Sequence, residues 1–124
     1  MGLIRKKLEV AGSLGKRDCD VLFDTGASAC FVRESVAREF AQVLKWPTPL
    51  TFTLGDETTI TAEHTTDLQV DIKGHPLAHM FLVVPNLPCE VVIGADFLQR
   101  WKIKLDPATE DFNIDERALE ILLV

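Results

Sequence analysis

Hydrophobic and polar positions alternate along much of the chain, a pattern typical of β-strands with one buried face. Leu3 to Ala11 alternates loosely and runs into a turn-forming cluster at Gly12 to Gly15. In Leu68 to Ile72 every second residue is apolar, and Lys73 to Pro76 then turns the chain into an apolar stretch at Leu77 to Val84. The first segment predicts a strand that ends in a turn, and the second predicts a pair of strands joined by a short turn.

Another pair of strands is predicted in the middle of the chain. Leu50 to Leu54 and Thr58 to Ala62 are rich in threonine and apolar residues, and Gly55 to Glu57 between them suits the tip of a β-hairpin. Further short strands are predicted from apolar runs at residues 20–23, 90–93, 103–105, 112–114 and 119–124.

Two segments favour helices instead. Apolar residues recur at helical spacing in Phe31 to Leu44, and Trp46 to Pro49 is expected to stop that helix. Asp96 to Trp101 fits a second short helix. With no repeat and no linker, the chain is predicted to form one all-β domain over residues 1–124, with one or two short helices.

The composition of the chain argues against nucleic acid and membranes as binding partners. The chain has 124 residues, of which 47% are hydrophobic and 26% are charged, as in ordinary globular proteins, and its net charge is −6. An acidic chain does not favour nucleic-acid binding, and the short basic run Arg5 to Lys7 fits a solvated arm. No stretch approaches the roughly 18 apolar residues of a membrane span, so no membrane partner is expected.

The cysteines and histidines predict no cofactor. Cys19, Cys30 and Cys89 are odd in number and lack a C-x-x-C spacing, which argues against both a disulfide framework and a zinc site. The surroundings of His75 and His79 predict a hairpin and not a helix, and along a strand residues four apart are about 13 Å from each other, too far to share one ion. Free cysteines and the lack of a signal peptide at the N-terminus favour a cytoplasmic location.

The chemistry centres on the segment Val21 to Ser28. Three apolar residues lead to Asp24, and a carboxylate at the end of a buried strand is costly unless it is hydrogen-bonded or functional. Gly26 permits the backbone to approach that carboxylate and donate an N–H to it, and the Thr25 hydroxyl can donate to a backbone carbonyl. The alternative interpretation is that Asp24-Thr25-Gly26 forms an ordinary turn after a strand.

A second motif, Val92-Ile93-Gly94 followed by Asp96-Phe97-Leu98, lies about seventy residues further on. Together with Asp24 to Ala27, it resembles the retropepsin-like aspartic proteases of retroviruses, retrotransposons and some cellular proteins. The resemblance covers roughly Leu8 to Asp115. It implies a half-barrel fold, with Phe52 to Thr61 as the β-hairpin called the flap.

The sequence departs from the family pattern in two places. The flap tip of many viral members is rich in glycine, whereas this tip has only Gly55, followed by Asp56 and Glu57. Many viral members also have a charged pair at the positions of Ser28 and Ala95, and neither residue is charged here.

The resemblance implies an aspartic endopeptidase that activates water between two carboxylates sharing one proton. Since the chain holds one Asp-Thr-Gly, the second carboxylate is expected from Asp24 of another copy in a homodimer. The residues implied as catalytic are Asp24, Thr25 and Gly26. Those expected to contact an extended polypeptide substrate are Leu22, Ala27, Ser28, Phe31, Leu54, Gly55, Asp56 and Val92.

Leu22, Phe31 and Val92 are all apolar, so apolar side chains are expected at the cleaved bond. The resemblance implies that the termini of both chains interleave as a sheet at the dimer interface. The apolar segment Leu119 to Val124 suits that role, because an exposed apolar edge strand would otherwise aggregate. Asp96 could be mistaken for a second catalytic carboxylate, but its position before an apolar helical pattern favours a helix N-cap.

Two alternatives remain open from the sequence. One is a non-catalytic dimeric binding or scaffold domain with the same fold. The other is an unrelated β-barrel binding module in which Asp24 is only a turn residue.

Overall fold

The structure is a computed structural model, and it describes residues 3–53, 57–117 and 119. The strands are β1 (Leu3–Gly12), β2 (Gly15–Asp24), β3 (Phe31–Arg33), β4 (Leu44–Thr53), β5 (Thr59–Ile72), β6 (His75–Val84), β7 (Val91–Ile93), β8 (Ile103–Asp106) and β9 (Asp111–Ile114). The helices are α1 (Glu34–Phe40) and α2 (Ala95–Arg100). Strands dominate the described residues, which confirms the predicted all-β class with two short helices.

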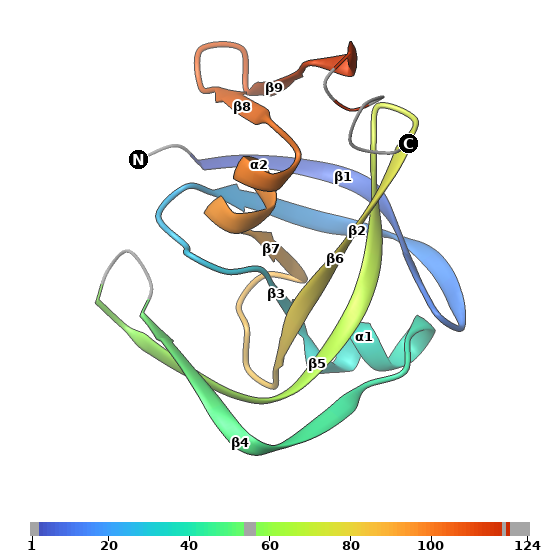
Figure 1. Cartoon of the computed structure of the whole chain (residues 1–124), viewed down its shortest axis with the longest axis vertical. Helices are drawn as coiled ribbons and strands as arrows, with labels where there is room; N and C mark the ends of the chain where they lie inside the picture. The colour runs from blue at the N-terminus through green and yellow to red at the C-terminus, as the bar shows by residue number, and fades with distance from the viewer. Residues whose placement is uncertain (1–2, 54–56, 118, 120–124) are drawn as a thin grey trace.

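Seven strands form one sheet in the order β1-β2-β7-β3-β6-β5-β4, while β8 and β9 pair separately. The long sheet curls back on itself because β1 also pairs with β5, with Val10 opposite Val70. Most neighbours are antiparallel, but β7 runs parallel to β2 and β3 runs parallel to β6. The β4–β5 hairpin lies at the opposite end of the molecule from β8 and β9 (Figure 1).

The predicted turns between paired strands are confirmed. β1 and β2 pair from Leu3 opposite Asp24 to Gly12 opposite Gly15. Between β5 and β6, Lys73 and Gly74 have φ angles of 50° and 88°. Positive φ at both central residues is the geometry of a two-residue hairpin turn whose twist matches that of the strands, and glycine adopts it without steric cost.

The strand pattern builds the core directly. Leu68, Val70 and Ile72 of β5 are all buried, whereas the residues between them reach solvent to different degrees. Phe81 of β6 and Phe97 of α2 are buried in the same cluster. The alternation of apolar and polar residues in the sequence therefore correctly predicts which side chains of β5 point into the core.

The helix predicted over Phe31 to Leu44 is wrong at both ends. Phe31–Arg33 is strand β3, because its backbone pairs with both β6 and β7 and tertiary pairing overrides the local apolar spacing. Helix α1 ends at Phe40, before the expected stop at Trp46 to Pro49. Those four residues lie inside β4, an edge strand, in the stretch between Lys45 and Leu50 where the pairing with β5 is interrupted. Proline is tolerated there because it removes no hydrogen bond of the ladder.

Two other expectations need correction. The strands predicted at Thr58 to Ala62 and Leu68 to Ile72 are one continuous strand, β5, because the intervening residues also pair with β4 and β6. Leu119, predicted to start a final strand, is buried and donates its backbone N–H to the Asp115 carbonyl at 3.0 Å, a helical hydrogen bond. Glu120 to Val124 lie outside the described residues.

Candidate active site

Asp24 is the last residue of β2, an interior strand of the sheet between β1 and β7. Val21 and Phe23 are buried in the main core, so Leu22 and Asp24 face the opposite side of the strand. Asp24 is half-buried, and its carboxylate therefore lies between the protein interior and solvent. The apolar residues before Asp24 anchor the strand that presents this group.

The backbone after Asp24 folds back onto the carboxylate. The Gly26 N–H donates to Asp24 Oδ1 at 2.8 Å, the hydrogen bond that the sequence predicts. The Ala27 N–H donates to the Asp24 carbonyl oxygen at 3.2 Å and closes the turn. A carboxylate with a backbone donor is held in a fixed orientation, which is what a group that must position water requires.

The two sequence motifs meet in space. Leu22 lies opposite Val92 on the parallel strands β2 and β7. Beyond β7, the Ala95 N–H donates to the Ala27 carbonyl oxygen at 2.7 Å and so ties the start of α2 to the Asp-Thr-Gly loop. Gly94 is required at this crossing, because a Cβ there would lie 2.2 Å from the Ala29 carbonyl oxygen.

An apolar cluster lies on the same side of the sheet as the Asp24 side chain. Its buried members are Ala27, Ala29, Phe31, Ala62, Leu82, Val84, Leu87 and Val92. The half-buried residues packed against it are Leu22, Phe52, Ile60 and Cys89. The structure thus brings together Leu22, Ala27, Phe31 and Val92, four of the predicted substrate-contacting residues, while Ser28 is exposed on the loop and Leu54, Gly55 and Asp56 lie outside the described residues.

Phe52 is a residue of this region that sequence reasoning missed. Its ring meets that of Phe31 edge-on, with centroids 6.0 Å apart, so the β4–β5 hairpin covers Phe31 in the single chain. The prediction named only the tip of the hairpin. Since Phe52 and Ile60 face each other across the hairpin, the alternation of its two arms was the signal that could have identified both.

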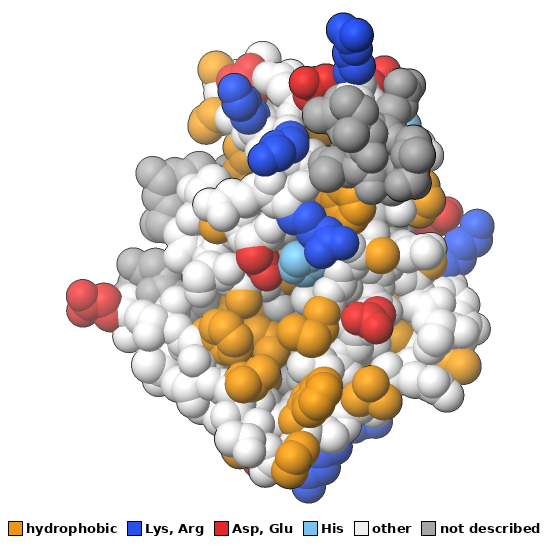
Figure 2. Space-filling model, viewed as in Figure 1, with side chains coloured by type: hydrophobic (Ala, Val, Ile, Leu, Met, Phe, Trp, Pro, Cys, Tyr) orange, Lys and Arg blue, Asp and Glu red, His pale blue; other side chains and the backbone are white. Residues whose placement is uncertain are grey.

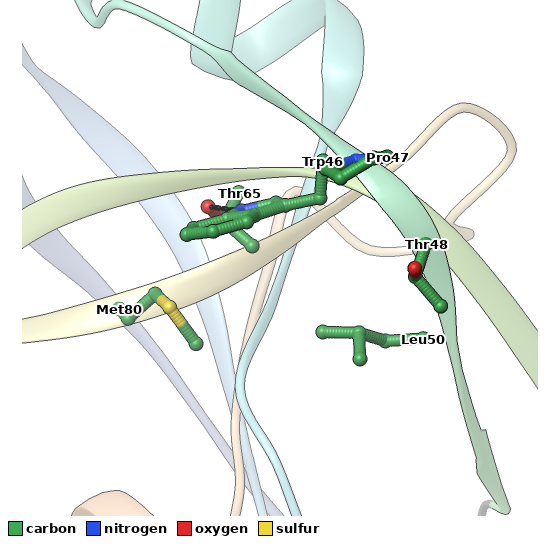
Figure 3. Close-up of a pocket in the computed structure, with 6 residues that line it drawn as sticks. All are labelled: Trp46, Pro47, Thr48, Leu50, Thr65 and Met80. Carbon is green, nitrogen blue, oxygen red and sulfur yellow. Dashed lines mark hydrogen bonds between the residues drawn. The ribbon is translucent and has the colours of Figure 1, made fainter.

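An apolar cavity of about 410 Å³ lies beside this hairpin (Figure 3). It is lined by Trp46, Pro47, Thr48, Leu50, Thr65 and Met80. The Trp46 Nε1–H donates to Thr65 Oγ1 at 2.6 Å, which fixes the indole over β5. Trp46 and Met80 are each 47% exposed, so the cavity leaves apolar surface open to solvent. Figure 2 shows hydrophobic side chains gathered on this face of the molecule.

Asp96 is not the helix N-cap that the sequence favours. Gly94 occupies the N-cap, and Asp96 lies one residue inside the helix. Its Oδ1 accepts hydrogen bonds from the Phe97 N–H at 2.7 Å and from Cys30 Sγ at 3.2 Å, while Oδ2 lies 2.9 Å from His79 Nε2. The residue just after the Asp-Thr-Gly loop is thereby linked to α2 and β6.

These contacts shift the pKa values of Asp96 and Cys30. Burial disfavours the charged form of Asp96, but hydrogen bonds from His79 and Cys30 outweigh it and hold the pKa of Asp96 below its ordinary value. Burial, followed by the charge of Asp96, raises the pKa of the Cys30 thiol far above its usual range. Cys30 is therefore a neutral thiol that donates to the Asp96 carboxylate.

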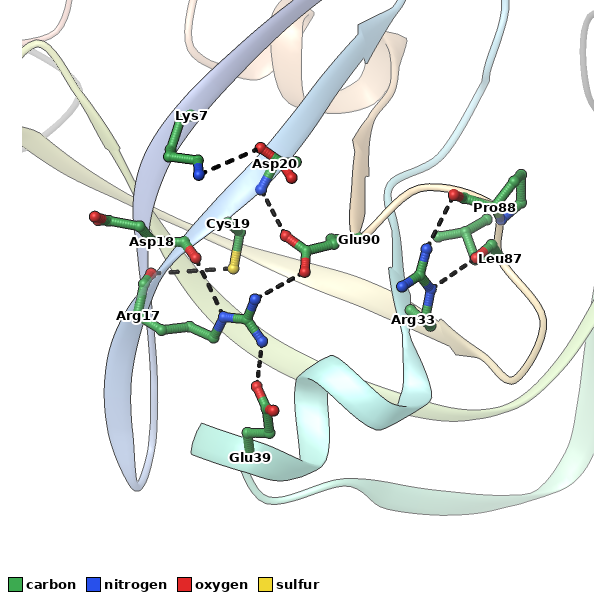
Figure 4. Close-up of polar contacts among 10 residues, drawn as sticks. All are labelled: Lys7, Arg17, Asp18, Cys19, Asp20, Arg33, Glu39, Leu87, Pro88 and Glu90. Carbon is green, nitrogen blue, oxygen red and sulfur yellow. Dashed lines mark hydrogen bonds and ion pairs between the residues drawn. The ribbon is translucent and has the colours of Figure 1, made fainter.

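A second polar network holds the segment that leads into β7 (Figure 4). Glu90 Oε1 accepts the Asp20 N–H at 2.8 Å, and Glu90 Oε2 lies 2.7 Å from Arg17, which also bonds Glu39. The hydrogen bond from Asp20 is the main cause that lowers the pKa of Glu90. The network ties β7 to β2 one residue before Val91, and it was not predictable from the separation of these residues in the sequence.

Thr25, the remaining catalytic candidate, is exposed and lines a surface cavity of about 790 Å³ beside α2 and β8. Apolar side chains of Leu98, Ile103 and Leu105 also line that cavity.

No helix within the described ranges is long and apolar enough to cross a bilayer.

Comparison with known proteins agrees with this geometry. The family model described as gag-polyprotein putative aspartyl protease matches residues 10–100. A comparison with curated protein sequences finds no match. The fold is similar to the crystal structure of the retroviral protease-like domain of Ddi1 from Leishmania major, with a TM-score of 0.61 and 14% sequence identity over 93% of this chain and 88% of that chain.

The family match spans the Asp24 loop, the hairpin and the Gly94 crossing, and the structural similarity confirms the predicted retropepsin-like fold. The chain therefore belongs to the gag-polyprotein putative aspartyl proteases, a family of retropepsin-like aspartic proteases.

Proposed function

We propose that the chain is an aspartic endopeptidase that hydrolyses peptide bonds as a homodimer. The observation that carries the proposal is the half-buried Asp24 carboxylate, held by the Gly26 N–H at 2.8 Å beside an apolar cluster. The hydrogen bond orients the group, and the cluster offers surface for apolar substrate side chains. The family of the chain supports the reaction class.

The reaction needs two carboxylates that share one proton. One acts as general base on a water molecule, while the protonated one polarises the scissile carbonyl group. The water attacks the carbonyl carbon, its proton passes to the base, and the amine leaves with a proton from the pair. Because this chain has one Asp-Thr-Gly, the second carboxylate would come from Asp24 of the other copy across a two-fold axis.

The surface around Thr25 supports pairing on that side of the molecule. Thr25 is exposed, and the neighbouring cavity presents Leu98, Ile103 and Leu105. The cavity is also lined by Lys102 and Lys104, so it is a mixed surface in which Leu105 is the most exposed of the three leucine and isoleucine side chains. A second copy that covered its apolar part next to the Asp-Thr-Gly loop would bury that part favourably. Residues 120–124, which lie outside the described residues, are proposed to extend this interface.

The substrate is proposed to lie extended between the β4–β5 hairpin and the two Asp24 side chains, bonded through its backbone as an added strand. Leu22, Phe31 and Val92 are proposed to favour apolar side chains at the cleaved bond. Phe52 now covers Phe31, so the hairpin would shift when a peptide enters. The tip residues Leu54, Gly55 and Asp56 are proposed to contact the bound chain.

The test is cleavage of an unstructured protein by the purified chain, compared with the variant Asp24→Asn. Cleavage that loses at least about a hundredfold in rate in the variant, with its circular dichroism unchanged, supports the proposal. Sedimentation of the same samples reports the dimer. A folded dimer without any cleavage of varied peptide libraries would favour the non-catalytic binding domain instead.

A further inference from the structure

Three side chains that the sequence separates widely meet beside the Asp-Thr-Gly loop. Cys30 directly precedes β3, His79 lies on β6 and Asp96 lies in the first turn of α2. Cys30 Sγ is 3.2 Å from Asp96 Oδ1, and His79 Nε2 is 2.9 Å from Asp96 Oδ2. One ligand atom from each residue lies within 4.8 Å of the others. The cluster is separate from the Asp24 carboxylate that the proposed reaction uses.

A thiolate, an imidazole and a carboxylate are the three ligand types of tetrahedral zinc sites. Zinc binds them at about 2.0–2.3 Å, so neighbouring ligand atoms of a tetrahedron lie roughly 3.3–3.7 Å apart. The two short separations in this cluster are a few tenths of an ångström below that range, because hydrogen bonds now join the atoms. An ion bound to one Asp96 oxygen would replace these hydrogen bonds, and it would also draw Cys30 Sγ and His79 Nε2, which lie within 4.8 Å of each other, into the same coordination sphere.

The ligands are already held in place by their surroundings. The His79 ring packs edge-on against Phe81 and Phe97, with centroids 6.1 and 5.4 Å away. The Gly94 N–H donates to Cys30 Sγ at 3.4 Å, a contact that also favours a thiolate. Such supporting contacts fix ligand orientation, and a metal site without them is usually too loose to bind well.

The cluster is open to solvent on one side. The His79 and Asp96 side chains are 13% and 39% exposed, and both line a surface cavity of about 560 Å³ together with Asp67 and Arg100. The opposite charges of Asp67 and Arg100 offset each other at its mouth. Three protein ligands with an open side leave a fourth position for water, as in many zinc sites with exchangeable ligands.

We infer that Cys30, His79 and Asp96 bind a divalent transition metal of the zinc class, one ion per chain, with water as the fourth ligand. The ion displaces the thiol proton of Cys30 to solvent, and His79 binds through Nε2 with its proton on Nδ1. It joins the segment after the Asp-Thr-Gly loop, β6 and α2 at one point. The site stands whether or not the chain cleaves peptides.

The sequence pointed away from a metal, because the cysteines lack zinc-finger spacing and the paired histidines lie on a strand. His75 and His79 remain unsuited to share an ion, and only His79 is part of the cluster. The three ligands come from separate elements, so the sheet pairings that align β3 with β6 and β7 create the site.

The experiment is a cobalt titration of tag-free full-length chain under reducing conditions, followed by ultraviolet and visible absorption. We expect one Co²⁺ per chain, with a thiolate-to-cobalt charge-transfer band that Zn²⁺ abolishes by displacement. Cys30→Ser should lose the band, while Cys89→Ser, a matched cysteine control, should keep it. A missing band in the wild-type chain, or a band that survives Cys30→Ser, overturns the inference.

A second measurement tests the site without Cys30→Ser, in case that variant does not fold. Zn²⁺ should raise the melting temperature of the wild-type chain, since an ion that binds only the folded state stabilises it. His79→Gln and Asp96→Asn should weaken zinc binding by at least about tenfold and lose most of this rise. His75→Gln, four residues away on the same strand, should keep it. An equal rise in all four proteins would show that zinc binds elsewhere.

Discussion

Gly94 and Ala29 pack so closely that a Cβ at position 94 would lie 2.2 Å from the Ala29 carbonyl oxygen. The contact is backbone against backbone, so no side chain can move aside to relieve it. It sets the distance between the Asp-Thr-Gly loop and the start of α2, where the Ala95 N–H also bonds the Ala27 carbonyl. Gly94 is therefore required for the Asp-Thr-Gly loop to pack against the start of α2.

Gly94→Ala should therefore destabilise the chain by about 2 kcal/mol or more, because the loop and α2 must separate. Denaturant unfolding measures the loss. Gly15→Ala is the matched control, since the nearest atom to its added Cβ, Phe40 Cβ, is at an ordinary 3.9 Å. Equal stability losses in the two variants would show that the Gly94 crossing is not tight.

The proposed shared site predicts a specific result when subunits mix. Adding an equal amount of Asp24→Asn chain to a fixed amount of wild-type chain should reduce cleavage to about half, because half of the wild-type subunits then sit in mixed dimers. The measurement is the cleavage rate after exchange at several mixing ratios. An unchanged rate, with exchange shown by labelled subunits, would mean that each chain works alone.

Much of this architecture can be predicted from local patterns, because hairpins combine alternation with turn residues. The turn at Lys73 and Gly74 and the β4–β5 hairpin both have such local signals. The predicted helix is longer than α1, since Phe31 and Val32 are apolar residues that fit a helix or a strand equally well. Only the pairing of Phe31–Arg33 with β6 and β7 makes the segment a strand.

The polar clusters were not predictable for a different reason. Cys30, His79 and Asp96 converge because three elements cross, and no spacing in the sequence encodes that crossing. Arg17 and Glu90 likewise meet only through the parallel pairing of β2 and β7. Asp96 looked like an N-cap because the helix was expected to start one residue later than it does.

Glu90 predicts how stability depends on pH. Its pKa is lowered in the folded chain, first by the Asp20 N–H and then by Arg17, relative to an ordinary value of 4.5. The ionised group therefore stabilises the fold above that ordinary value, and the contribution is lost as pH falls through the lower folded pKa. Glu90→Gln should cost about 1 kcal/mol at pH 7 and progressively less in acid.

The measurement is the free energy of unfolding of both proteins from neutral to acidic pH. The gap between wild type and Glu90→Gln should be widest at neutral pH and close as pH falls below 4.5 through the lower folded pKa of Glu90. Glu63→Gln changes an exposed carboxylate and serves as the control. A gap that widens in acid would reverse the predicted sign and refute this role for Glu90.

Phe52 offers a test of the hairpin as part of the substrate site. Its ring packs on Phe31 beside the apolar cluster that contains Leu22 and Val92, so a peptide entering there would meet it. Phe52→Ala should lower kcat/KM for an extended apolar peptide about fivefold, the equivalent of about 1 kcal/mol of lost apolar contact. The loss should fall mainly on KM, because Phe52 lies apart from the reacting carboxylates.

Thr53→Ala is the matched control, because Thr53 is the next residue of β4 and its exposed side chain lies on the other face of the hairpin. Both variants remove side-chain atoms from the same strand, so a general weakening of β4 would affect both. Steady-state kinetics on one peptide, with melting temperatures measured in parallel, separates the two effects. If Thr53→Ala raises KM as much as Phe52→Ala does, the hairpin acts through its stability, and Phe52 does not contact the substrate.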